Sequence, residues 1–281
     1  MQSLCGIQRM MPVRTGLAAG LLGLSLTVPA AAATTELSYV VYFGYVPALD
    51  VTTSIETGDG RYRVQARVEP QAWISWALPW IAVSEASGRL AADGAVTPEH
   101  YHSEGTWGTR KRETSLDFAA DGTLKTPPEP LKPEEGREPV PPELLKAILD
   151  PVSAVMAMLE PARPGRAGCA PSVPVFDSRR RFDIHAERQP DATLEPAYYS
   201  AYAGSAVVCQ LRFKSLAGGY RDGERSRFWQ TDKPGEERPP IELWLAPLQE
   251  GAQPVPVYVA GKSILGWVTA YISSYTLPPK T

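Results

Sequence analysis

The chain has 281 residues, with 28 Lys or Arg against 31 Asp or Glu and a formal net charge of −3. This length is enough to bury a sizeable core. This weakly acidic composition argues against nucleic-acid binding, which requires a basic surface. It also disfavours electrostatic docking on anionic lipid.

The N-terminus has the three parts of a secretory signal peptide. Arg9 and Arg14 precede an apolar run at residues 16–26, and a small-residue tract follows at residues 30–33. The run is too short to cross a bilayer, which takes roughly 20 apolar residues. We therefore expect residues 1–33 to be cleaved off near Ala33 and the protein to work in the periplasm or outside the cell. No later stretch approaches membrane-spanning length.

Alternating apolar residues and turn signals predict strands through most of residues 34–281. Along Arg61–Val68, apolar residues at every second position predict a strand with one buried and one solvated face. Asp-Gly dipeptides such as Asp59-Gly60 favour tight hairpin turns. Further strands are predicted at residues 37–43, 51–57, 83–90, 99–106, 110–118, 180–187, 206–213, 225–231, 241–246, 255–259 and 265–277. Short strands between regular turns indicate a mostly β chain with an antiparallel meander.

The middle of the chain differs from the rest. Residues 126–142 hold seven prolines and predict an extended loop rather than a central strand. Two short helices are predicted after it, at Pro142–Leu149 and from Pro151 onward, because Asp150 supplies an N-cap acceptor before a first-turn proline. We treat residues 34–281 as one domain with a long loop; a boundary between two domains is the alternative.

The second predicted helix has an apolar stripe. The stripe consists of Val152, Val155, Met156 and Leu159, at i, i+3, i+4 and i+7. We expect the stripe to face the sheet, where it is a candidate contact surface for an apolar ligand.

Several motifs occur in an order that resembles a known family. They are Leu37-Ser38-Tyr39-Val40-Val41-Tyr42-Phe43-Gly44, Tyr62-Arg63-Val64, Asp150-Pro151-Val152-Ser153-Ala154, Val175-Phe176-Asp177-Ser178-Arg179-Arg180-Arg181-Phe182, and Leu243-Trp244 followed by Pro254-Val255. Across residues 36–277 the chain resembles the secreted bacterial family DUF 3108, a domain of unknown function. The resemblance implies a fold like that of periplasmic lipoprotein carriers: a curved antiparallel sheet, or incomplete barrel, with two or three short helices on its concave face. It implies no catalytic residues. We also expect no cofactor.

Cys169 and Cys209 are the cysteines left once residues 1–33 are removed. An even number in an oxidising compartment predicts a disulfide between them, and two buried free thiols are the alternative. A metal site is disfavoured because the pair lacks CxxC spacing and further ligands.

The segment Trp73–Ile81 holds three of the seven tryptophans of the chain. Trp73, Trp76 and Trp80 fall at i, i+3 and i+7, on one face of a short helix, although Pro79 would bend or end that helix. Together with Leu78, this face could contact a lipid-like ligand or a partner protein, because indole joins a large apolar body to one polar N–H. The alternative, which we favour, is a core plug between two strands.

His100, His102 and Glu104 alternate along one predicted strand and so share one side. Two imidazoles and a carboxylate can bind zinc, and an open fourth position would permit metal-dependent hydrolysis. Such rows also arise by chance on a solvated strand face, and we expect no metal here. The sequence has no serine-hydrolase elbow, complete phosphate-binding loop or HExxH helix.

These features favour a non-catalytic carrier or binding protein for an apolar or amphiphilic molecule of the cell envelope. One alternative is an envelope assembly protein that binds another protein through its Trp-rich segment. The other is a metal-dependent hydrolase.

Overall fold

The computed structural model describes residues 33–77, 79–125, 137–160, 168–170, 172–219, 239–263 and 266–278, without the side chain of Trp107. These residues belong to one compact unit, residues 31–281. Four of the predictions concern segments that lie wholly or mostly outside the described residues. They are the signal peptide, the residue Leu78, most of the proline-rich loop and the strand at residues 225–231.

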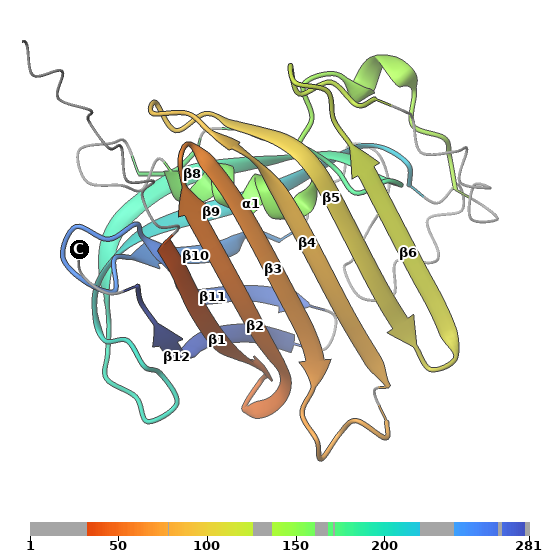
Figure 1. Cartoon of the computed structure of the whole chain (residues 1–281). Helices are drawn as coiled ribbons and strands as arrows, with labels where there is room; N and C mark the ends of the chain where they lie inside the picture. The colour runs from red at the N-terminus through yellow and green to blue at the C-terminus, as the bar shows by residue number, and fades with distance from the viewer. Residues whose placement is uncertain are drawn as a thin grey trace, which may run out of the picture. The chain divides into compact units, whose positions relative to one another are not determined.

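The described residues form one twelve-stranded antiparallel sheet (Figure 1). Its strands are β1 (Ala33–Phe43), β2 (Val46–Gly58), β3 (Arg61–Pro70), β4 (Trp80–Leu90), β5 (Val96–Trp107), β6 (Arg110–Asp117), β7 (Val173–Phe176), β8 (Arg181–Leu194), β9 (Gly204–Ala217), β10 (Ile241–Ala246), β11 (Val255–Ser263) and β12 (Gly266–Thr276). The spatial order is β6-β5-β4-β3-β2-β1-β12-β11-β10-β9-β8-β7. Within the described residues β6 and β7 are the two edges and do not pair, so the sheet is not closed. The prediction of a mostly β, antiparallel chain is confirmed.

The β2–β3 hairpin shows why the sequence folds in this register. Asp59 and Gly60 both have positive φ, 50° and 69°, as a tight two-residue hairpin turn requires. Beyond the turn, Tyr62 and Val64 are buried on one face of β3, whereas Arg61 and Arg63 are exposed on the other. The alternation read from the sequence therefore decides which face of the strand is inward.

One α-helix packs on the inward face of the sheet. Helix α1 (Pro151–Leu159) begins at Asp150, whose side chain accepts from the backbone N–H groups of Val152, at 3.0 Å, and Ser153, at 2.9 Å. Figure 1 shows α1 between the strands β1–β6 in front and the strands β8–β12 behind. The helix contacts β4, β5 and β7. Its buried side chains share one apolar core with strands from both halves of the sheet. No helix in the described part of the chain is long and apolar enough to cross a membrane.

Of the two or three short helices that the sequence predicts, α1 is the one α-helix in the described residues. Besides α1, the described residues contain only the 3-10 turn η1 (Pro142–Leu145). The predicted helix at Pro142–Leu149 ends early because Ala147 has a positive φ of 51° and Leu149 joins β7 instead. Leu149 accepts from the N–H of Phe176 and donates to the carbonyl of Pro174, both at 2.9 Å. These sheet contacts satisfy backbone groups that a longer helix would have used internally.

Cys169 and Cys209 form a disulfide, as the sequence predicts. The bond ties the segment at residues 168–170 to β9 and closes a loop with a sequence separation of 40 residues. In the unfolded chain, this cross-link removes conformational freedom that folding would otherwise have to overcome.

Replacing both cysteines with alanine is expected to lower the free energy of unfolding by about 3–4 kcal/mol, the loop-entropy value for a loop of this size. Urea unfolding of the oxidised protein and the variant measures the difference. Wild-type protein kept under reducing conditions is the matched control and should unfold with the variant. Identical midpoints for the oxidised protein and the variant would contradict this role of the bond.

Candidate functional site: a cavity between the sheet and the helix

A cavity of about 330 Å³ lies between α1 and the inward face of the sheet. This sheet–helix cavity is lined by Leu37, Tyr39, Val51, Thr53, Ile55, Val64, Ala66, Ser84, Tyr101, Pro151, Val152, Val155, Met156, Leu159, Pro256, Val259 and Ala270. The lining comes from β1–β5, α1, β11 and β12. Its volume falls at the lower end of the range for small-molecule sites.

Small side chains leave this space unfilled. The sheet side of the cavity includes four residues with short side chains: Thr53, Ala66, Ser84 and Ala270. On the helix side, Val155 is 41 % exposed although it lines the cavity. An apolar side chain left open to solvent beside an unfilled space marks where a ligand could enter and bury apolar surface.

The cavity is uncharged. None of the described residues that line it is acidic, basic or histidine. Burial raises the pKa of the Tyr39 and Tyr101 hydroxyls, so both stay protonated at neutral pH. The Ser84 hydroxyl contacts Ser103 Oγ at 2.9 Å within the sheet. The walls therefore favour an apolar occupant, because a charged group would lose its hydration without gaining a partner.

A buried hydrogen-bond chain holds the start of α1 to the sheet. Ser153 Oγ donates to Asp150 Oδ2, which commits the single hydroxyl proton of the serine. When Asp150 is ionised, the Tyr62 hydroxyl on β3, 2.6 Å from Ser153 Oγ, therefore donates to it. Tyr62 has room because β4 carries glycine at position 88, where an added Cβ would lie 2.7 Å from the tyrosine oxygen.

Burial raises the pKa of the Asp150 carboxyl. The residue is fully buried, and this raises the pKa of its carboxyl to about 6, although hydrogen bonds from Ser153 and Val152 act in the opposite direction. The folded protein therefore binds a proton on Asp150 at a pH where the unfolded chain, with a value near 3.8, has released it.

The free energy of unfolding is accordingly expected to rise as the pH falls through 6. The contribution of Asp150 is complete below about pH 4 and is lost as the pH rises above 6, because only the folded state retains the proton in that window. A shift of about two pKa units corresponds to about 3 kcal/mol. Urea unfolding across this pH range measures the effect.

The control is Asp150→Asn, which keeps an N-cap acceptor but does not titrate. The stability difference between the two proteins should change with pH by up to about 3 kcal/mol, with the variant relatively more stable near neutral pH. Parallel pH profiles would show that the burial of Asp150 carries no such linkage.

The structure brings together the four helix residues that the sequence singled out. Val152, Val155, Met156 and Leu159 all line the sheet–helix cavity. The three tryptophans of the Trp-rich segment, Trp73, Trp76 and Trp80, do not.

The Trp-rich segment lies at the surface. Residues 72–77 form consecutive turns rather than a helix, and β4 begins at Trp80, which is half-buried. The exposed fraction is 53 % for Trp73 and 83 % for Trp76. The core-plug interpretation is therefore wrong for these two residues, because the short connection keeps their rings outside the sheet.

Other exposed aromatic residues gather at the same end of the sheet. Trp73 Nε1 donates to the carbonyl of Pro47 at 3.1 Å, which ties the Trp-rich segment to the start of β2. Gly44 N donates to the carbonyl of Trp267 at 2.8 Å, which ties the β1–β2 turn to the start of β12. Tyr45 in that turn and Trp267 are both exposed. We call Tyr45, Trp73, Trp76 and Trp267 the aromatic end.

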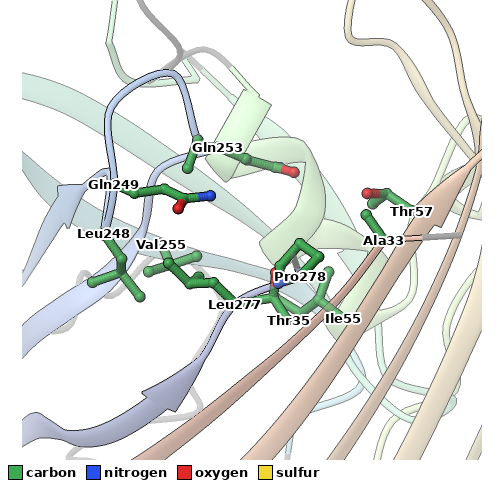
Figure 2. A pocket seen from close by; sticks show the side chains of 11 residues that line it. Ala33, Thr35, Ile55, Thr57, Leu248, Gln249, Gln253, Val255, Leu277 and Pro278 are labelled. Atoms are coloured by element: carbon green, nitrogen blue, oxygen red, sulfur yellow. The ribbon is translucent and has the colours of Figure 1, made fainter. Parts of the chain in front are cut away.

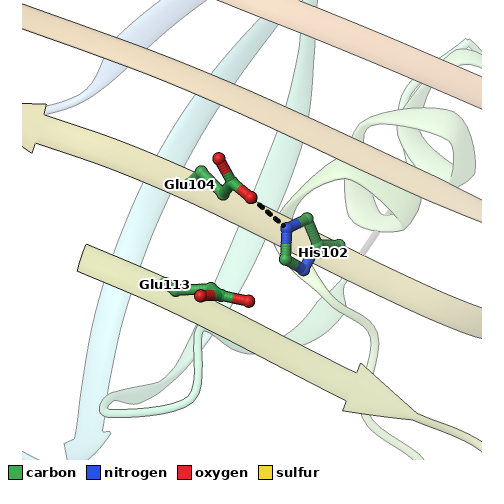
Figure 3. A group of neighbouring side chains, drawn as sticks. All are labelled: His102, Glu104 and Glu113. Carbon is green, nitrogen blue, oxygen red and sulfur yellow. Dashed lines mark hydrogen bonds and ion pairs between the residues drawn. The ribbon is translucent and has the colours of Figure 1, made fainter. Parts of the chain in front are cut away.

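The predicted histidine row is divided between two pairs on the outward face of β5. His102 Nε2 lies 3.1 Å from Glu104 Oε1, and His100 Nδ1 lies 2.8 Å from Asp117 on β6. Glu113, directly across from Glu104, completes a group with His102 whose possible ligand atoms lie within 4.8 Å of one another (Figure 3). These side chains are half-exposed or exposed, as acidic groups on a solvated strand commonly are.

The sequence did not predict which strand residues line the cavity, and it did not predict that Glu113 lies beside His102 and Glu104. The alternation of apolar and polar residues places Val64 and Ala66 on one face of the strand. It does not predict a space between that face and a helix. The available signal was the small size of Ala66, Ser84 and Ala270 at inward positions. Glu113 becomes a neighbour of His102 only through the β5–β6 register.

A family model described as "Protein of unknown function (DUF3108)" matches residues 38–259. The chain belongs to the DUF3108 family. A search of the curated proteins finds no match.

Two solved structures are similar at low identity. The "putative lipoprotein from Parabacteroides distasonis ATCC 8503" is 7 % identical, with a TM-score of 0.32, over 86 % of this chain and 94 % of that one. The "putative outer membrane lipoprotein-sorting protein domain from Vibrio parahaemolyticus" is 8 % identical, with a TM-score of 0.31, over 87 % of this chain and 85 % of that one. Both TM-scores lie below 0.5, so neither structure defines the fold or the function of this DUF3108 protein.

Proposed function

We propose that this DUF3108 protein is a non-catalytic carrier or binding protein for an apolar or amphiphilic molecule of the cell envelope. In this proposal the open sheet acts as an incomplete barrel, and α1 only partly fills its concave face. The observation that carries the proposal is the uncharged cavity of about 330 Å³ between α1 and the sheet, with Val155 exposed at its wall. Filling it would remove apolar surface from water.

The proposed location is the periplasm or the cell exterior. The Cys169–Cys209 disulfide supports it, because such bonds persist in oxidising compartments. The signal-peptide pattern of the first 33 residues supports it independently.

The carrier function is tested by binding of the apolar fluorophore N-phenylnaphthylamine to delipidated protein. We expect saturable fluorescence enhancement, and we expect Val155→Arg to weaken it at least about tenfold, because a charge at the cavity wall opposes apolar burial. The matched control is Val83→Arg: Val83 is 40 % exposed, close to the value for Val155, but it alternates with the cavity residue Ser84 and so faces outward on β4. Binding that does not saturate, or that both variants weaken equally, would contradict the proposal.

A second candidate function is an envelope protein that contacts another protein through the aromatic end. The exposure of Trp73 and Trp76 favours it, because large exposed aromatic groups are typical of interaction sites.

Photo-crosslinking in whole cells tests this second candidate. A crosslinking amino acid at position 76 should give one defined partner, and Trp73→Ala should remove that product by deleting a neighbouring contact. The control position is Asp59, which is exposed in the β2–β3 turn at the opposite end of β3. The same products from both positions would indicate chance encounters and rule the candidate out.

A further inference from the structure

A second cavity, of about 150 Å³, lies where β1 begins and β2 ends (Figure 2). This end pocket is lined by Ala33, Thr35, Ile55, Thr57, Leu248, Gln249, Ala252, Gln253, Val255, Leu277 and Pro278. In Figure 2 the side chains from β1 and β2 face those of the β10–β11 connection and of the segment after β12.

The two cavities follow each other along the same strands. On β1, Ala33 and Thr35 line the end pocket, and the next inward residues, Leu37 and Tyr39, line the sheet–helix cavity. Ile55 on β2 lines both cavities, and it stands opposite Thr35 in the sheet register. Ile55 is therefore the residue at which the two spaces adjoin.

The two cavities differ in chemistry. Both cavities are lined mainly by apolar residues, but the lining of the end pocket also includes two amide side chains, Gln249 and Gln253, which the sheet–helix cavity lacks. Gln253 Nε2 donates to the buried Glu160 Oε1 at 2.9 Å, which orients this amide. None of the described residues that line the end pocket is charged. Hydroxyls and amides without a cation suit an uncharged hydrogen-bonding group better than a carboxylate or phosphate.

We propose, on the basis of the carrier function above, that the two cavities form one site for a single-chain amphiphile with an uncharged polar head. The apolar chain lies in the sheet–helix cavity, the head lies in the end pocket, and Ile55 forms the passage between them. From Tyr39 to Ala33 the strand advances about 20 Å, which is the length available to the ligand along β1. A monoacylglycerol has the required chemistry: one acyl chain, hydroxyl groups and no charge.

Blocking the passage tests the proposal. In competition with N-phenylnaphthylamine, palmitoylglycerol should bind Ile55→Phe at least about tenfold more weakly than wild type, because the head group and the adjoining methylenes lose their place. The fluorophore shares the wall that Ile55 forms in the sheet–helix cavity, so its affinity for Ile55→Phe is measured in parallel, and the proposal requires the loss for palmitoylglycerol to exceed the loss for the fluorophore by at least about fivefold. Ile55→Val, which keeps the passage open, is the matched control and should behave like wild type. Unchanged palmitoylglycerol binding by Ile55→Phe would overturn the proposal.

A second variant removes a head-group contact without changing the core. Gln249→Leu, in the β10–β11 connection, should weaken palmitoylglycerol about fivefold, the value of one hydrogen bond, and should leave the fluorophore unaffected. If Ile55→Phe does not fold, this variant decides the question, and equal affinities for wild type and Gln249→Leu refute the head-group position.

The outcomes separate this proposal from the carrier function. Failure of the fluorophore to bind wild-type protein would remove the carrier function itself. Saturable fluorophore binding, with palmitoylglycerol indifferent to both Ile55→Phe and Gln249→Leu, would remove only the two-cavity site.

Discussion

The buried contact between α1 and β3 is the constraint on which the candidate site depends. Asp150 caps the helix, and its partner Ser153 receives the Tyr62 hydroxyl from the sheet at 2.6 Å. This polar contact is inside the core, where the loss of either partner would leave a buried group unsatisfied. The N-terminal turn of the helix is therefore tied to a fixed point on the sheet. In the turns that follow, Met156 and Leu159 are buried, whereas Val155 remains exposed beside the cavity.

The cavity follows from that attachment and from the size of the opposing side chains. A helix pinned over larger residues would have been buried completely, as interiors normally are. Here the short side chains of Ala66 and Ala270 line the gap, and Val155 keeps a solvent-exposed surface. Such a gap costs dispersion contacts in the empty protein. An apolar ligand would restore those contacts, which explains in physical terms why a carrier would maintain the gap.

The sequence was sufficient for the elements that local rules decide. Alternation along Arg61–Val68 gave the strand and its buried face, and Asp150-Pro151 gave the start of α1. It was insufficient where a distant segment overrides local preference. Leu149 leaves the predicted helix to pair with β7, and the turns at residues 72–77 hold the tryptophans outside the sheet. The site was half predictable: the helix stripe was visible in the sequence, but the strand residues facing it depend on sheet register and on how far the helix stands from the sheet.

The central claim is that an apolar chain occupies the space between α1 and the sheet. Native mass spectrometry of the full protein, purified from the cell envelope without organic solvent or detergent exchange, tests it most directly. The account predicts one bound amphiphile per polypeptide, present in wild type and absent from Val155→Arg purified in parallel. The mass of the bare polypeptide alone, unchanged after incubation with an excess of palmitoylglycerol, would contradict it.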